Sequence, residues 1–259
     1  MTLEALEQDE LDRVFHLKYE TSGPIGSTPS LYRKFDYHSP DDYYEALVNR
    51  LVGGETAWLD VGCGRALFPS NFPLAKVLSE RCKTLVGVDP DPTIMENPVV
   101  HEAVQESVYE YRTDKRFDLV TLRMVAEHID DPQALLLTLT ECTRNGSIVV
   151  TYTVNAWSPI PLLTRLTPLA VRHPLKKLLW QTDEKDTFPT TYRMNTRKQL
   201  RTMFAGSGFS EIFFSYLDDC RTLSRFQTLL SAELAVWFAL NKISVRYPEL
   251  CILAAYQRS

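Results

Sequence analysis

Short apolar runs alternate with helix-type patterns through the middle of the chain, over residues 58–152. The clearest runs cover residues 58–61, 85–88 and 117–122. Strands of this kind, separated by helices, are typical of a parallel sheet that helices cover on both faces. The pattern therefore predicts an α/β core, and it shows no internal repeat.

The segments on either side of this core carry helical patterns and turn signals. Residues 11–17 predict an amphipathic helix, and a loop rich in Gly, Pro and Ser is expected over residues 21–30. Thr196 is expected to cap a late helix, and residues 221–243 predict a long apolar helix. Most such apolar stripes belong to a core, and packing against a second copy is the alternative.

A Gly-rich turn follows the first apolar run, and an acidic residue ends the second. Gly62 and Gly64 permit positive φ and let the backbone approach a ligand, and the start of the next helix offers free N–H groups. Pro69 and Pro73 place that start at residues 70–72. Asp89 can hold ribose hydroxyls at its strand end. This layout predicts a nucleoside-binding βαβ unit, whereas no phosphate-loop Gly-Lys-Ser/Thr sequence occurs.

The turn Asp60-Val61-Gly62-Cys63-Gly64 resembles the first motif of the class I S-adenosylmethionine-dependent methyltransferases, which reads acid-x-Gly-x-Gly. Later segments resemble this family's landmarks in the same order: residues 99–102 its third strand, 117–122 its fourth strand, 126–132 its Glu-His-x-x-x-Pro continuation, 145–152 its turn into strand five, and 200–209 its late helix and Gly-Phe turn. The resemblance implies a Rossmann-like doubly wound seven-stranded sheet with a mainly helical lid insertion. The sheet is expected to be mostly parallel, with an antiparallel last strand over residues 250–256 at its edge.

The same resemblance implies S-adenosylmethionine as the cofactor and S-adenosylhomocysteine as the product. The residues at the family's cofactor positions are Asp60, Gly62, Cys63, Gly64, Asp89, Pro90, Glu106, Ser107 and Arg123. Asp89 would meet the ribose, and Glu106 with Ser107 would meet the adenine.

His128 is the candidate general base, because it follows the fourth strand at a position that faces the pocket in related enzymes and imidazole titrates near neutral pH. A hydroxyl acceptor benefits from such a base, whereas a neutral amine does not. The alternative is that His128 holds its loop, with Glu127 as its companion.

Residues 156–195 exceed what a minimal doubly wound domain needs, and they are too apolar and aromatic for a linker. This insertion is predicted to be a substrate lid. Its basic amphipathic part, residues 157–180, suits an acidic apolar substrate or a membrane surface, or it is a helix packed on the sheet with snorkelling cations. The candidate substrate contacts are Tyr32, Arg33, Tyr192 and Arg193, each of which can also be explained as a packing or surface residue. The predicted divisions are an N-terminal cap over residues 1–40, a cofactor-binding core over 41–155, the lid over 156–195 and the rest of the core over 196–259.

Composition narrows the class of protein. The chain has 259 residues with a net charge of −5, which argues against general nucleic-acid binding. Its five cysteines lack paired spacing, so neither disulfides nor a zinc site is predicted, and no other metal cluster is apparent. An acidic start and the lack of a long apolar run predict a cytoplasmic protein.

The sequence thus predicts a methyltransferase that acts on a small molecule through oxygen or nitrogen, with a partly apolar or acidic acceptor. A dinucleotide-dependent oxidoreductase and a non-catalytic relative that serves as a partner subunit are the alternatives. The oligomeric state stays open.

Overall fold

The computed structural model describes residues 2–21, 24–159, 190–221 and 224–259. Its strands are β1 (Ala57–Val61), β2 (Thr84–Val88), β3 (Glu102–Val104), β4 (Phe117–Arg123), β5 (Thr143–Val154), β6 (Phe209–Asp218) and β7 (Glu249–Arg258). The helices are α1 (Gln8–Tyr19), α2 (Ser27–Lys34), α3 (Pro40–Leu51), α4 (Phe72–Arg81), the 3₁₀ turn η1 (Pro92–Glu96), α5 (Pro132–Cys142), α8 (Arg197–Gly206) and α9 (Gln227–Lys242).

All seven strands form one sheet, in the order β3-β2-β1-β4-β5-β7-β6. The pairs from β3 to β5 are parallel, and β7 runs antiparallel to both β5 and β6. The expected mostly parallel sheet with an antiparallel last strand is confirmed. The expected edge position of that strand is wrong, because β7 inserts between β5 and β6 and leaves β6 at the edge.

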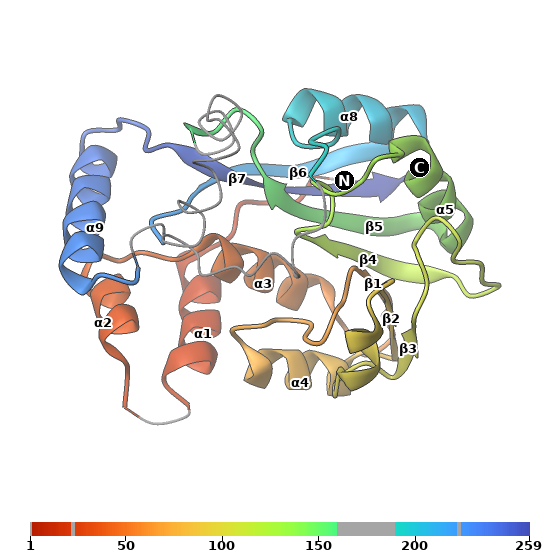
Figure 1. Cartoon of the computed structure of the whole chain (residues 1–259), viewed down its shortest axis with the longest axis horizontal. Coiled ribbons are helices and arrows are strands. Elements are labelled where there is room, and N and C mark those ends of the chain that lie inside the picture. The colour runs from red at the N-terminus through yellow and green to blue at the C-terminus, as the bar shows by residue number, and fades with distance from the viewer. Residues whose placement is uncertain (1, 22–23, 160–189, 222–223) are drawn as a thin grey trace, which may run out of the picture.

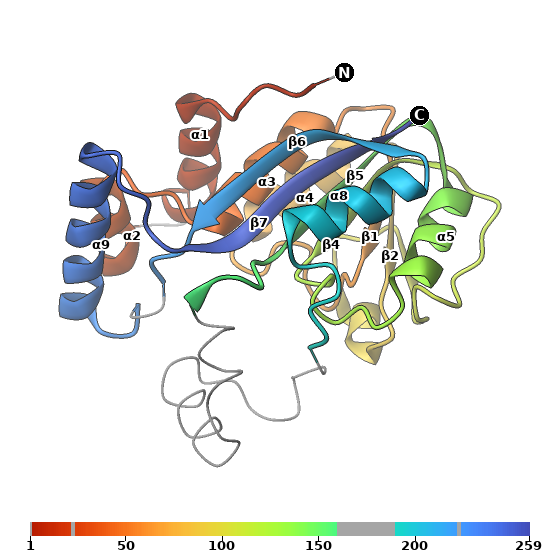
Figure 2. The same ribbon diagram turned by 90° about the horizontal axis from the view of Figure 1, so that it is seen from above.

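Helices cover the sheet on both faces (Figure 1). α1, α3 and α4 lie on one face, α5 and α8 lie on the other, and α2 packs beside α9 at one end (Figures 1 and 2). Adjacent strand residues serve opposite faces: Trp58 joins the core under α3 and α4, whereas Leu59 joins the core under α5 and α8. This arrangement makes the sheet a buried divider between two apolar layers.

Several element boundaries differ from the predicted ones for local reasons. β3 begins at Glu102 because the backbone of Val99 is already bonded by side chains: its N–H donates to Asn97 Oδ1 and its carbonyl accepts from Ser79. α2 begins at Ser27, inside the predicted loop, because Pro29 is compatible with a first helical turn. α9 begins at Gln227, six residues later than expected.

Other boundaries agree with the sequence. α4 begins at Phe72 with Asn71 as its cap, since the Asn71 side chain accepts from the Leu74 N–H at 3.2 Å. Thr196 caps α8 as expected, accepting from the Gln199 N–H at 3.2 Å. Of the predicted lid, residues 160–189 lie outside the described residues, and with them most of the basic amphipathic segment.

Candidate functional site

A cavity of about 450 Å³ opens at the carboxyl ends of β1, β2 and β4. Parallel strands bring their following loops together at this end of a sheet, which is where doubly wound domains bind ligands. The lining comes from the ends of β1 and β2 and from the loops after β2, β3 and β4, with one residue from the end of the insertion: Val61, Gly62, Val88, Asp89, Pro90, Ser107, Val108, Tyr109, Met124, Val125, His128, Ile129, Asp130 and Thr191.

Gly62 lets the backbone turn at the floor of this cavity. Its φ is +71°, and a Cβ built on it would lie 2.2 Å from Val125 Cγ2. The Gly62 N–H donates to the Val88 carbonyl at 2.8 Å, which ties the turn to the end of β2. Only glycine fits here without moving Val125, so the close approach is built into the sequence.

Asp89 is one of two acidic residues in the cavity lining, together with Asp130. Its two carboxylate oxygens accept from backbone N–H groups, Oδ2 from Gly64 at 2.9 Å and Oδ1 from Asp91 at 2.8 Å. A carboxylate oxygen accepts two hydrogen bonds, so each retains capacity for a ligand hydroxyl. Burial raises the pKa of Asp89, and the two backbone bonds oppose that rise. The residue is therefore oriented by the backbone and equipped to hold a diol.

Asn97 holds the glycine turn from behind, and the sequence reasoning missed it. Its side-chain amide donates to the Gly64 carbonyl at 3.1 Å and to Cys63 Sγ at 3.2 Å. Cys63 is buried against Gly87, and burial together with the neighbouring Asp60 raises the pKa of its thiol far above the usual range. Cys63 is thus a buried residue that packs the turn in place.

Asp60 lies beneath the turn, outside the cavity lining. Thr121 donates its hydroxyl to Asp60 Oδ1, and the Thr121 oxygen accepts from Trp58 Nε1 at 2.7 Å. Complete burial raises the pKa of Asp60 to about 7, although the Thr121 hydrogen bond lowers it. This carboxyl supports the β1 end across the neighbouring strand.

His128 lines the cavity, and the loop that carries it is fixed by the segment that leaves the insertion. The Glu127 carbonyl accepts from the Thr191 N–H at 2.8 Å, and the Thr191 hydroxyl donates to the Ile129 carbonyl at 2.6 Å. Arg193 Nη1 donates to the Asp130 carbonyl at 2.5 Å. Thr191 thereby reaches the cavity from the end of the segment that the sequence predicts to be a lid, although the sequence singled out its neighbours Tyr192 and Arg193 instead.

The remaining predicted residues lie outside this lining. Glu106 is exposed, although its neighbour Ser107 does line the cavity. Arg123 Nη2 instead pairs with Asp41 Oδ1 at 2.9 Å. Tyr192 and Arg193 directly follow Thr191 but do not line the cavity, and their substrate role stays a prediction.

Tyr32 and Arg33 line a separate hollow of about 410 Å³ between α1 and α2. Tyr32 is buried there edge-on against Tyr37, with ring centroids 5.1 Å apart, and Arg33 pairs with Glu20. Neither residue therefore lines the cavity beside Gly62 and Asp89.

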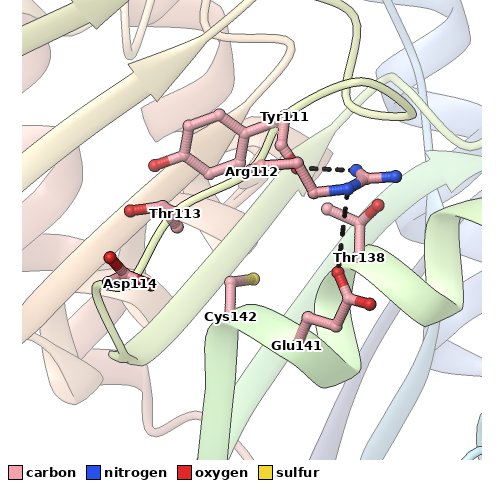
Figure 3. A pocket seen from close by; sticks show the side chains of 7 residues that line it. All are labelled: Tyr111, Arg112, Thr113, Asp114, Thr138, Glu141 and Cys142. Atoms are coloured by element: carbon pink, nitrogen blue, oxygen red, sulfur yellow. Dashed lines mark hydrogen bonds and ion pairs between the residues drawn. The ribbon is translucent and has the colours of Figure 1, made fainter.

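A third hollow, of about 350 Å³, lies between the loop before β4 and the last turn of α5 (Figure 3). Arg112 and Glu141 face each other across it at 4.0 Å, and Cys142 lies at its base with its thiol pKa raised to about 11 by burial. This hollow lies at the amino end of β4, whereas the cavity opens at its carboxyl end, and the loop between β3 and β4 contributes residues to both.

Charged groups elsewhere form a buried network between α1, α3 and the sheet. Asp41 bridges Arg123 and Arg221, and these two guanidinium groups hold the pKa of Asp41 far below its usual range despite burial. Lys18 pairs with Asp42 at 2.8 Å and Glu45 at 3.3 Å. No group of three metal-ligating side chains occurs within the described ranges, and none of the described helices is long and apolar enough to cross a membrane.

The sheet order and the covering helices define a doubly wound α/β domain with a cavity at the carboxyl ends of its parallel strands. The family model for the methyltransferase domain matches residues 32–212, well over half of the chain, and the chain belongs to that family. The S-adenosylmethionine-dependent methyltransferase class expected from the motifs is thereby confirmed.

One curated relative is the ubiquinone biosynthesis O-methyltransferase of Rhodopseudomonas palustris, 28% identical over 105 residues, which are 38% of this chain and 39% of the relative. The matched region thus spans about two fifths of that protein's length.

Solved structures agree on the fold. The geranyl diphosphate C-methyltransferase of Streptomyces coelicolor, solved with its substrate, Mg²⁺ and S-adenosylhomocysteine, has a TM-score of 0.55 at 12% identity, covering 96% of this chain and 88% of that one. An S-adenosylmethionine-dependent methyltransferase from Mesorhizobium loti has a TM-score of 0.53 at 15% identity, covering 85% and 98%.

Proposed function

We propose that the cavity binds S-adenosylmethionine and that the protein transfers its methyl group to the oxygen or nitrogen of a small molecule. The observation that carries the proposal is the pairing of Gly62 with Asp89. The glycine turn admits a ligand where a Cβ would collide with Val125, and Asp89 keeps acceptor capacity beside it. These are the two requirements of a ribose-binding strand end.

The other lining residues suit the remaining parts of this cofactor. Val108 and Tyr109 offer an apolar and an aromatic surface for a base, and Ser107 offers a polar one. A sulfonium cofactor supplies an activated methyl group, so the protein's own task is binding, alignment and exclusion of water. The walls formed by Met124, Val125 and Ile129 serve that exclusion.

His128 is the residue in the lining that accepts a proton from a hydroxyl acceptor in this proposal. The acceptor itself is proposed to be partly apolar or acidic. That part rests on the basic, leucine-rich sequence over residues 157–180 and on the O-methyltransferase named above.

The test is calorimetric titration with S-adenosylhomocysteine, with NAD and NADP in parallel. We expect binding of S-adenosylhomocysteine alone. Asp89→Ala should weaken it about ten- to hundredfold, because a hydrogen-bonded charged acceptor is lost. Asp91→Ala is the matched control, since the Asp91 carboxylate accepts from the Thr93 N–H at 2.8 Å at the start of η1 and lies outside the cavity lining.

Binding of a dinucleotide alone would replace the proposal with the oxidoreductase alternative. Absence of binding to all three ligands would favour the alternative that the protein is a non-catalytic relative.

A further inference from the structure

We infer that Glu127, Thr153 and Asn195 form a positioning clamp, which sets the acceptor end of the cavity by fastening the end of the insertion to the loop that carries His128. The inference rests on the proposed function for its catalytic meaning. Its structural part stands on the described contacts alone.

The clamp is a chain of buried hydrogen bonds in which each side chain donates to the next. Asn195 Nδ2 donates to Thr153 Oγ1 at 2.7 Å, and Thr153 Oγ1 donates to Glu127 Oε2 at 2.6 Å. The Thr153 hydroxyl therefore uses one acceptor site and its only proton. All three side chains are buried, with Thr153 and Asn195 fully so, so their polar groups depend on one another for partners.

The main chain extends the clamp in both directions. Asn195 Nδ2 also donates to the Val154 carbonyl at 3.1 Å, and the Asn195 carbonyl accepts from the Ala156 N–H at 2.9 Å. Both ends of the insertion thus meet at Asn195. On the other side, the Glu127 carbonyl accepts from Thr191 and Tyr192.

The position of the clamp gives it a role in the reaction. Glu127 precedes His128, and Thr191 lies in the same cavity lining as His128. The clamp fixes the positions of His128 and Thr191 relative to each other, although one follows β4 and the other lies at the end of the insertion. Glu127, Thr153 and Asn195 themselves lie outside the lining, so they act through their neighbours.

Strand β5 supplies a matched pair of threonines for the test. Thr151 lies two residues before Thr153 on the same face and is equally buried, but its hydroxyl has no hydrogen-bond partner. Thr153→Val removes the clamp hydroxyl, Thr153→Ser retains it, and Thr151→Val makes the same change where no hydrogen bond is lost.

Amide hydrogen exchange measures the clamp without any ligand. We expect the amides of Ala156, Thr191 and Tyr192 to exchange about tenfold faster in Thr153→Val than in the unmodified protein, and at the unmodified rate in Thr153→Ser and Thr151→Val. With an acceptor in hand, Thr153→Val should raise its KM about tenfold while the KM for S-adenosylmethionine stays within twofold.

Equal exchange in Thr153→Val and Thr151→Val would overturn the clamp, as would equal losses of cofactor and acceptor affinity, which indicate general loosening. If Thr153→Val fails to fold, Asn195→Ala gives the same comparison from the other end. Failure of the unmodified protein to bind S-adenosylhomocysteine would contradict the proposed function and leave the exchange result to decide the clamp.

Discussion

The cavity beside Gly62 and the buried network around Asp41 both depend on carboxylates, but they use them in opposite ways. Asp89 is held by two backbone N–H groups and retains acceptor capacity toward the cavity. Asp41 is taken up by two guanidinium groups, and Lys18 satisfies Asp42 and Glu45. Backbone donors orient a carboxylate and leave its remaining acceptor sites open to a ligand. Cationic side chains instead neutralise its charge and occupy its acceptor sites. The first arrangement favours binding, and the second favours a fixed structure.

The largest effect is expected from Lys18→Met, which breaks the network at its most buried cation. Asp42 and Glu45 would be left buried without their ammonium partner. We therefore expect the free energy of unfolding to fall by about 3–5 kcal/mol. Urea denaturation measures this loss. Lys76→Met is the control, because its pair with Glu80 is exposed and 3.9 Å long, and it should change stability by less than about 0.5 kcal/mol. A loss below about 1 kcal/mol for Lys18→Met would show that the network does not stabilise the fold.

Gly62→Ala should act on the cavity instead. The new methyl group would collide with Val125 at the floor of the site, and we expect about a hundredfold weaker S-adenosylhomocysteine binding. Gly146→Ala is matched in backbone strain, with φ at +90°, but no atom lies within 4 Å of its added Cβ. Titration of both variants separates collision from strain, and equal losses would refute the close-approach argument.

The pH dependence of stability should change in Asp60→Asn. The folded-state pKa of Asp60 is raised to about 7 from an ordinary value of 3.8, so the folded protein keeps a proton that the unfolded chain has released between these values. Asp60 therefore lowers stability as pH rises through this window, with a slope approaching roughly 1.4 kcal/mol per pH unit. Denaturation at pH 4.5, 5.5 and 6.5 should show a shallower decline for Asp60→Asn. Parallel curves would mean that Asp60 titrates normally.

The smallest effect on binding is expected from Arg123→Met. The sequence assigns Arg123 to the cofactor, but the structure pairs it with Asp41, which keeps Arg221 as a second partner. We expect a stability loss of about 1–2 kcal/mol and an S-adenosylhomocysteine affinity within twofold of the unmodified protein. A loss of S-adenosylhomocysteine affinity without a loss of stability would instead assign Arg123 to the cofactor site. The cavity and the buried network would then share a residue.

The sequence correctly predicts the features that depend on residues close together in the chain. The cap at Thr196, the start of α4 near Asn71 and the turn at Gly62 all follow from short-range stereochemistry. The end positions of β1 and β2 then bring Gly62 and Asp89 together, because parallel strands share one orientation.

Long-range contacts explain most of what the sequence does not reveal. Thr191 reaches the cavity only because Glu127 and Ile129 offer it carbonyl groups, and Asn97 supports Gly64 from 33 residues away. The position of β7 inside the sheet depends on pairing with two strands at once, which periodicity within one strand does not encode. These contacts join residues that are far apart in the sequence, so local patterns do not predict them.

The hydrogen bond between the Ala156 N–H and the Asn195 carbonyl has a consequence for engineering. A segment whose two ends already touch can be shortened or exchanged without moving the strands on either side, because closing a loop costs free energy that grows only slowly with its length. Only the part of this stretch before Thr191 can be exchanged in this way, because Thr191 lines the cavity and bonds to the loop that carries His128. We expect a foreign segment grafted between Ala156 and Thr191 to leave S-adenosylhomocysteine binding unchanged.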